Sequence, residues 1–166
     1  MQKEIYLAGG CFWGTEAFMQ RINGVINAES GYANGNSLNP TYQEVCQGSG
    51  HAEVVKVTYD SEKISLAKLL DYYFKVIDPV SVNQQGEDKG IQYRTGIYYV
   101  DPADISTIEQ ALTELQKQYA EPLAVEQEML DHYFPAEEYH QDYLDKNPNG
   151  YCHIDIQLMN EILKNQ

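Results

Sequence analysis

The sequence predicts an α+β fold, a two-layer sandwich in which helices cover one face of a mixed, largely antiparallel sheet. Its 166 residues are enough for one domain with a proper core. A hydrophobic content of 43% is typical of a globular fold, and the expected strands and helices mix without the strict alternation of a parallel sheet. We therefore expect one domain over residues 1–166, with residues 145–166 as its C-terminal tail.

The first half of the chain predicts two strands and two helices. An apolar strand over 5–8 turns through Gly9-Gly10 into a helix over 13–22, which ends before an Asn-Gly pair. A polar loop rich in Gly, Asn and Pro covers 31–42, and a strand follows over 53–59. A regular apolar stripe then predicts a second helix whose buried face consists of Leu66, Leu69, Leu70, Tyr73, Phe74 and Ile77.

The second half contains shorter elements, with no internal repeat or linker between them. Asp78-Pro79 ends the second helix, and Asp101-Pro102 begins a third whose apolar positions run from Ile105 to Tyr119. The other expected elements are a polar loop over 83–90, a strand over 93–100, a third inner strand over 123–127, a short helix over 136–144 and a turn over 147–150.

The composition argues against several kinds of partner. A net charge of −14 at pH 7 opposes binding to phosphate backbones, so we expect no nucleic-acid partner. No apolar run of about eighteen residues occurs and no basic, apolar leader precedes Ile5. We therefore expect no membrane association, and a cytoplasmic monomer if Met1 is the native start. The three cysteines are too scattered for a structural disulfide framework or a zinc site, so no metal is expected.

Cys11 is the strongest candidate for chemistry, because it lies where the first strand turns through two glycines into the first helix. Unpaired backbone N–H groups and the helix dipole stabilise an anion at a helix N-terminus, so a thiol there loses its proton more easily. Phe12 and Trp13, the chain's only tryptophan, follow at once and give the thiolate an aromatic wall. A small buried cysteine beside core aromatics is the alternative, but this setting favours a reactive thiolate.

Glu53 is the next candidate, since residues 53, 55, 57 and 59 point to one side of a strand and the last three are apolar. Desolvation there would raise the pKa of the carboxyl and keep it protonated near neutral pH, as a general acid requires. A strand-end glutamate in water is an equal alternative. Tyr42, Asp88 and Tyr93 lie in or beside polar loops, which hold site residues but more often form plain surface turns.

Three further residues are ambiguous from the sequence. His51 could partner Cys11 in a papain-like dyad, although no third orienting group is evident. Cys152 follows an Asn-Pro-Asn-Gly turn near the C-terminus, where a mobile chain could bring it to an oxidised partner. Cys46 lies between Val and Gln, a setting that favours a structural role.

A series of motifs resembles, in order and over nearly the whole chain, those of the A-type peptide methionine sulfoxide reductases. Any one motif is modest evidence, but the ordered set is highly specific. The motifs are Gly10-Cys11-Phe12-Trp13-Gly14-Thr15-Glu16, Gly31-Tyr32-Ala33, Pro40-Thr41-Tyr42-Gln43-Glu44-Val45-Cys46, Gly50-His51-Ala52-Glu53, Gln92-Tyr93-Arg94-Thr95, His140-Gln141-Asp142-Tyr143-Leu144 and Asn147-Pro148-Asn149-Gly150-Tyr151-Cys152.

The resemblance implies a ferredoxin-like version of the predicted fold and a repair enzyme for oxidised proteins. Such an enzyme reduces methionine S-sulfoxide, free or in proteins. By motif, Cys11 is the nucleophile, and Phe12 and Trp13 form the pocket for the substrate's S-methyl group. Glu53 is the acid for the sulfoxide oxygen.

The same resemblance implies the rest of the catalytic cycle. Tyr42 and Tyr93 donate hydrogen bonds to the sulfoxide oxygen, Asp88 helps to polarise the site, and Cys152 is the resolving cysteine. Attack by Cys11 leaves it as a sulfenic acid, which Cys152 converts to a disulfide. Thioredoxin or another dithiol resets the enzyme, so no metal or organic cofactor is implied. Because no cysteine follows Cys152, we expect thioredoxin to attack the disulfide between Cys11 and Cys152 directly.

Three other functions fit parts of the sequence. A thiol peroxidase would use Cys11 and Cys152 against hydroperoxides, but it would not need an aromatic pocket beside an acid. A binding module could hold methionine or its sulfoxide through Trp13 and the tyrosines without turnover. A cysteine hydrolase based on Cys11 and His51 would form an acyl-enzyme with ester substrates.

Overall fold

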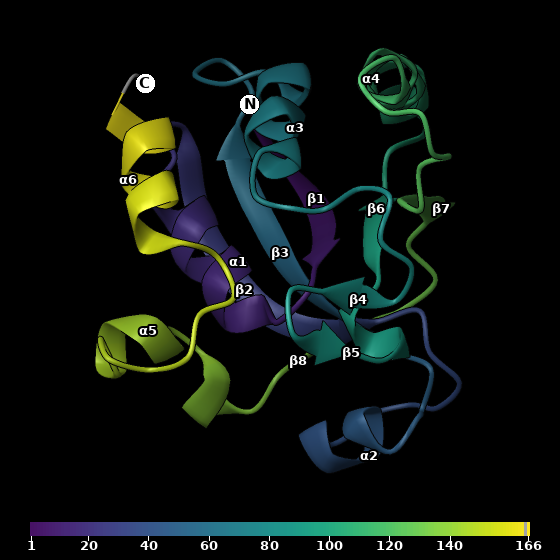
Figure 1. Cartoon of the computed structure of the whole chain (residues 1–166), viewed down its shortest axis with the longest axis vertical. Coiled ribbons are helices and arrows are strands. Elements are labelled where there is room, and N and C mark those ends of the chain that lie inside the picture. The colour runs from purple at the N-terminus through teal and green to yellow at the C-terminus, as the bar shows by residue number, and fades with distance from the viewer. Residues whose placement is uncertain (165) are drawn as a thin grey trace.

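A curled, six-stranded sheet forms the centre of the computed structural model, which describes residues 1–164 and 166 (Figure 1). The strand order is β7-β6-β1-β3-β2-β8, and every neighbouring pair is antiparallel except β6 and β7. This confirms the prediction of a mixed, largely antiparallel sheet. The strands are β1 Gln2–Gly9, β2 Val25–Ala33, β3 Ala52–Asp60, β6 Thr95–Tyr99, β7 Glu126–Met129 and β8 Tyr133–Pro135.

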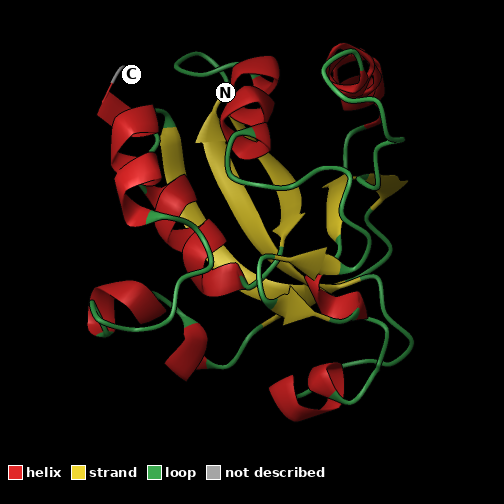
Figure 2. Cartoon of the chain, in the orientation of Figure 1, coloured by secondary structure: helices red, strands yellow, loops and turns green. Residues whose placement is uncertain are grey.

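Helices and a small hairpin surround this sheet (Figure 2). The helices are α1 Phe12–Gln20, α2 Tyr42–Cys46, α3 Leu66–Phe74, α4 Ile105–Gln116, α5 Tyr143–Lys146 and α6 Ile156–Lys164. The hairpin consists of β4 Gln84–Gln85 and β5 Asp88–Lys89. Three 3-10 turns are η1 Ile91–Tyr93, η2 Pro102–Asp104 and η3 Glu138–His140.

The pleat of β3 divides the core into two parts, because successive side chains point to opposite faces of a sheet. Val55, Val57 and Tyr59 belong to the larger cluster, which also contains apolar residues of α1 and α3. Ala52 and Val54 belong to a smaller cluster on the other face. The predicted stripe of the second helix is confirmed where α3 buries Leu66, Leu69, Leu70 and Tyr73.

The central strands and the helices with strong periodicity lie where they are predicted, but several peripheral predictions are wrong. The expected loop over 31–42 begins with the end of β2 and reaches the first residue of α2. The expected third inner strand is β7, an edge strand with two exposed residues. The expected helix over 136–144 is broken into η3 and the single turn α5, and the C-terminal tail contains α6, whose Met159 is fully buried.

Two of these errors have a physical cause in partners distant in sequence, for β2 and for the segment over 136–144. β2 forms because it pairs with β3 along its whole length, although its own residues include Asn, Glu and Gly. The backbone of Asp142 is left-handed, at φ 54°, which interrupts the expected helix.

Candidate active site

The sheet brings the candidate residues to one end. β1 is antiparallel to β3 and β6, so the end of β1 lies beside the beginning of both. Cys11 follows the end of β1, Glu53 is the second residue of β3, and Tyr93 precedes β6. β2 is antiparallel to β3 and ends at the same edge, nine residues before Tyr42 opens α2. Residues from four regions of the chain therefore meet around the nucleophile position.

Cys11 is the N-cap residue of α1 and is 8% exposed. The turn that leads to it needs glycine at position 10, where φ is +88° and a left-handed backbone disfavours other residues. Thr15 stabilises the turn, because its hydroxyl donates to the carbonyl oxygen of Gly9 at 3.3 Å. The predicted strand–turn–helix setting of Cys11 is confirmed.

The expected low pKa of Cys11 is wrong for this reduced structure. Burial raises the pKa of the thiol, and the charge of Glu53 raises it further, while the backbone N–H of Trp13 at the helix start lowers it by less. Desolvation therefore outweighs the helix N-terminus. The thiol keeps its proton until a substrate or a proton acceptor changes this balance.

Glu53 has the buried, acid-like environment that the strand pattern predicts. It is 1% exposed, and burial raises its pKa to about 8 even though the backbone N–H of Phe12 donates to Oε1 at 3.2 Å. The charge of Asp88 raises the pKa further. Oε2 is buried without a hydrogen-bond partner in the described part of the chain. At pH 7 the acid form of the carboxyl predominates, and one of its oxygens is free next to the loop that carries Cys11.

Tyr42, Tyr93 and Asp88 belong to the same electrostatic neighbourhood. Burial and then the charge of Glu53 raise the pKa of both phenols, so both remain hydrogen-bond donors. A capping box between Thr41 and Glu44 fixes the start of α2, where Tyr42 lies. Asp88 is half-buried in β5, and its Oδ2 accepts a hydrogen bond from the Tyr151 hydroxyl at 2.9 Å.

Phe12 and Trp13 form an aromatic wall that includes residues that the sequence arguments missed. The Trp13 indole stacks on Tyr143 with ring centroids 3.7 Å apart and an interplanar angle of 12°. Its Nε1 donates to Nδ1 of His140 at 3.0 Å. His140 also packs 5.2 Å from Phe12 and 4.5 Å from Tyr42, measured between ring centroids. The motif from His140 to Leu144 was the signal that could have identified both residues.

All three cysteines are free in this structure. Cys152 is half-buried, and its Sγ lies 2.9 Å from the position that a Cβ on Gly14 would occupy, one helical turn after Cys11. The structure therefore brings Cys152 to the nucleophile helix. Cys46 is exposed at the end of α2.

His51 does not have the contacts of a dyad partner for Cys11. Its Nδ1 lies 2.8 Å from the Ser49 hydroxyl, and its ring packs 5.5 Å from that of His132. The suggested Cys11–His51 dyad is therefore not supported. Among the residues that the structure describes, no group of three or more His, Cys, Asp and Glu side chains could hold a metal ion. In the same residues, no helix combines the length and apolar character that crossing a membrane requires.

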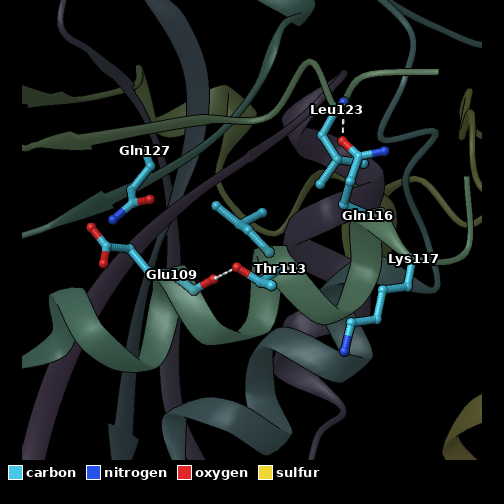
Figure 3. Close-up of a pocket in the computed structure, with 7 residues that line it drawn as sticks. Glu109, Thr113, Gln116, Lys117, Leu123 and Gln127 are labelled. Atoms are coloured by element: carbon cyan, nitrogen blue, oxygen red, sulfur yellow. Dashed lines mark hydrogen bonds between the residues drawn. The ribbon is translucent and has the colours of Figure 1, made fainter. Parts of the chain in front are cut away.

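The surface also has a groove of about 630 Å³ beside α4, away from these residues (Figure 3). It is lined by Glu109, Leu112, Thr113, Gln116, Lys117, Leu123 and Gln127. None of these is a candidate site residue, and the two hydrogen bonds drawn in Figure 3 join Thr113 to Glu109 and Leu123 to Gln116. The groove is a gap along α4 rather than a centre of chemistry.

Comparison with known proteins identifies the family. The family model for peptide methionine sulfoxide reductase matches residues 3–166. The chain belongs to the peptide methionine sulfoxide reductase family. Over 155 residues it is 57% identical to the peptide methionine sulfoxide reductase MsrA of Lachnoclostridium phytofermentans, and the match covers 93% of each chain. A peptide methionine sulfoxide reductase is an oxidoreductase, in agreement with the predicted class.

Solved structures give the same result for the fold, among them methionine sulfoxide reductase A of Corynebacterium diphtheriae, which is 33% identical with a TM-score of 0.81 and covers 91% of this chain and 77% of that chain. The reduced form of Mxr1 from Saccharomyces cerevisiae is 39% identical with a TM-score of 0.86, covering 91% of this chain and 88% of that chain. Mxr1 in complex with Trx2 is 25% identical with a TM-score of 0.62, covering 86% and 84% respectively. The mixed fold with its curled sheet is thus the fold of peptide methionine sulfoxide reductases.

Proposed function

We propose that this chain reduces the S epimer of methionine sulfoxide, free or in proteins, with Cys11 as nucleophile and Glu53 as the acid. Membership of the reductase family supports the reaction. The observation that supports these roles is the buried Glu53 carboxyl, protonated below about pH 8 with one oxygen unpartnered, beside the loop that carries Cys11. A sulfoxide sulfur becomes electrophilic when its oxygen is protonated or accepts hydrogen bonds.

Tyr42 and Tyr93 add two neutral donors for the sulfoxide oxygen, and Asp88 keeps the Glu53 proton in place by raising its pKa. Donors aimed at a developing charge in a dry site contribute about 2–4 kcal/mol each. The proposed pocket for the S-methyl group consists of Phe12 and Trp13. An apolar methyl group gains free energy when it moves from water to the apolar surface of these rings. The buried Phe12 and the stacked Trp13 fit that requirement.

The first step transfers the sulfoxide oxygen to Cys11. The Cys11 sulfur attacks the sulfoxide sulfur while Glu53 gives its proton to the oxygen, and the thiol proton of Cys11 replaces it on Glu53. Methionine leaves, and Cys11 is oxidised to a sulfenic acid. No metal or organic cofactor takes part in this step.

The second step forms a disulfide between Cys11 and Cys152, and thioredoxin then reduces it by thiol–disulfide exchange. The position of Cys152 Sγ beside Gly14 supports this pairing. The complex of the yeast relative Mxr1 with Trx2 supports thioredoxin as the reductant. We also propose a cytoplasmic location, because three scattered cysteines do not form the structural disulfide framework of a secreted protein. A monomeric state, the two-layer arrangement and one domain over residues 1–166 remain predictions.

A single-turnover experiment tests the proposal. Separated S and R epimers of a methionine sulfoxide peptide are mixed with the reduced protein without reductant, and methionine and remaining thiols are counted. We expect reduction of the S epimer alone, with the loss of two thiols per molecule. Cys152→Ser should lose one thiol and cease to turn over with thioredoxin, whereas the control Cys46→Ser should behave as wild type. Failure to reduce either epimer would refute the proposed function.

A further inference from the structure

His153 and Cys152 dock beside the nucleophile, in a notch that two glycines leave open. A Cβ on Gly14 would lie 2.9 Å from Cys152 Sγ and 3.3 Å from His153 Nδ1. A Cβ on Gly10 would lie 3.0 Å from His153 Nε2. Both atoms lie close to the same point, the Cβ position on Gly14, so the distance between Cys152 Sγ and His153 Nδ1 cannot exceed the sum of 2.9 Å and 3.3 Å. The proposed cycle uses Cys152 but gives its neighbour His153 no role.

The hydrogen bond between His153 and Gly9 defines which ring nitrogen carries the proton. Nε2 lies 2.8 Å from the carbonyl oxygen of Gly9, which can only accept, so Nε2 donates. Nδ1 of the neutral ring then has a free lone pair. It is buried and has no hydrogen-bond partner within the described residues, which is uncommon for a buried polar atom. Burial also lowers the pKa of His153, so the ring is neutral at pH 7.

Cys152 needs a proton acceptor before it can resolve a sulfenic acid. Burial raises the pKa of its thiol, and Sγ donates to the carbonyl oxygen of Ile154 at 3.2 Å. The thiol is therefore protonated in the reduced protein. Because the thiolate is the nucleophile in disulfide formation, a base close to Sγ would accelerate this step.

We propose that His153 is the base of the resolving step, in which Nδ1 accepts the proton of the Cys152 thiol while the Nε2–Gly9 hydrogen bond holds the ring beside Cys11. This inference rests on the proposed function, since it requires a sulfenic acid on Cys11. As the proton moves to Nδ1, the sulfur of Cys152 attacks the sulfur of Cys11. An S–S bond forms and the S–O bond breaks. The hydroxyl leaves as water with the proton from His153, so the ring ends neutral.

Oxidation and reduction balance in this step. The Cys152 sulfur is oxidised and the Cys11 sulfur is reduced from sulfenic acid to disulfide, so no further oxidant is needed. The groups that face His153 are compatible with the role. The negative charge of Asp88 in β5 favours the transient imidazolium, and the neighbouring Cys152 thiol is neutral because burial raises its pKa. Tyr151, next in the chain, bonds to Asp88.

Two substitutions distinguish a role of His153 as a base, through Nδ1, from a role as an anchor, through the hydrogen bond from Nε2 to Gly9. His153→Gln keeps an N–H that can reach Gly9 but has no base in place of Nδ1, whereas His153→Leu removes both functions. The reduced proteins are mixed with the S epimer of a sulfoxide peptide, and quenched samples give the rates of methionine release and disulfide formation. We expect methionine release at the wild-type rate in both variants and disulfide formation at least about 100-fold slower, the lower range for general base catalysis. His132→Gln is the same change in a histidine whose ring packs against His51 and Phe134, and it should match wild type.

The pH profile adds a readout that a packing defect would not produce. The rate of disulfide formation in wild type should rise as His153 loses its proton, and this inflection should be absent from His153→Gln. Disulfide formation at the wild-type rate in His153→Gln would overturn the proposal. So would a slow His153→Leu beside a normal His153→Gln, because His153 would then be an anchor only. If wild type released no methionine, the proposed function would fail, yet one equivalent of hydrogen peroxide would still place a sulfenic acid on Cys11 and test the base.

Discussion

The carboxyl of Glu53 has one oxygen bonded to the Phe12 N–H and the other without a partner among residues 1–164 and 166. Its pKa of about 8 means that the acid form predominates at neutral pH and is lost as the pH rises further. Above that value, the protonated fraction of the carboxyl, which is the proposed proton donor, falls about tenfold per pH unit. If Glu53 is the acid, the oxygen transfer should therefore slow at alkaline pH as this one residue loses its proton.

Glu53→Gln tests this property, since the amide can still accept from Phe12 but has no proton of comparable acidity to give. We expect single-turnover reduction of the sulfoxide to fall about 100- to 1,000-fold, within the range for a lost general acid or oxyanion donor. The decline of the wild-type rate above about pH 8 should vanish in the variant. Glu138→Gln is the control, because the Glu138 side chain is 90% exposed. An alkaline decline that persists unchanged in Glu53→Gln would remove Glu53 as the acid.

His140 controls the orientation of Trp13 through the hydrogen bond from Nε1 to Nδ1. His140→Asn places an amide oxygen near the former Nδ1, whereas His140→Leu leaves the indole N–H without a partner. We expect the leucine variant to raise KM about 2- to 12-fold, the value of one hydrogen bond, with little change in kcat. The asparagine variant should restore much of the loss. Trp13 is the only tryptophan, so its single indole N–H signal in a ¹⁵N NMR spectrum reports the bond directly; a signal identical in all three proteins would contradict the role.

The individual residues of the site differ in how far the sequence predicts them. Local patterns point to Cys11 at a strand–turn–helix junction and to Glu53 on an alternating strand, although the strand pattern alone leaves a solvated Glu53 as an equal alternative. The direction in which the pKa of Cys11 shifts is not predictable from the sequence, because it depends on how much of the chain covers the thiol. In the structure, burial outweighs the helix N-terminus. His140 and Tyr143 escape local patterns since they reach Trp13 across more than 120 residues.

At the scale of one helix, α1 has the proposed nucleophile Cys11 at its start and, at position 14, a glycine that makes room for Cys152. A Cβ at position 14 would lie 2.9 Å from Cys152 Sγ, closer than real Cβ contacts come, so the sulfur would have to move. Alanine is also favoured over glycine within a helix by about 1 kcal/mol. Helix stability therefore favours alanine at position 14, whereas the proposed resolving step favours glycine.

Gly14→Ala should affect protein stability and disulfide formation in opposite directions. We expect a thermal unfolding midpoint at or above that of wild type, because the alanine stiffens α1. Methionine release in a single turnover should remain within about twofold of wild type, while disulfide formation slows about tenfold, a barrier change of about 1.4 kcal/mol. Rapid-quench thiol counting gives both rates from one experiment, with methionine release as the internal control. Unchanged disulfide formation would show that Cys152 does not need the notch.

The elements that the sequence predicts best are those whose periodicity is strong enough to stand alone. α3, α4 and β3 are of this kind, and each buries the face that its pattern defines. β2, β8 and α2 are missed because their stability comes from pairing and capping rather than composition. α6 has an apolar pattern of its own, with Met159 buried, but the proximity to the chain end favoured a mobile tail over a helix.

Across the whole molecule, the antiparallel order of β1, β3 and β6 gathers the site at one end of the sheet. The same packing buries a second carboxyl, Glu16, which is 2% exposed. Its oxygens accept from the backbone N–H groups of Asp142 at 2.8 Å and Ser30 at 3.2 Å. Burial nevertheless raises its pKa to about 7. The folded protein therefore holds protons on Glu16 and Glu53 that the unfolded chain releases near pH 4.3.

Stability should consequently fall as the pH rises from about 5 to 8. A carboxyl whose pKa is raised by folding adds stability that is complete below its unfolded pKa and is lost as the pH rises through its folded pKa. Each group adds a slope of up to about 1.4 kcal/mol per pH unit. Urea unfolding at a series of pH values should give a shallower profile for Glu16→Gln up to about pH 7 and for Glu53→Gln up to about pH 8. Glu138→Gln should retain the wild-type slope. The histidines contribute equally to all four proteins, so their contribution cancels when the profiles are compared. Profiles of Glu16→Gln and Glu53→Gln that run parallel to wild type would mean that neither carboxyl is protonated in the folded protein.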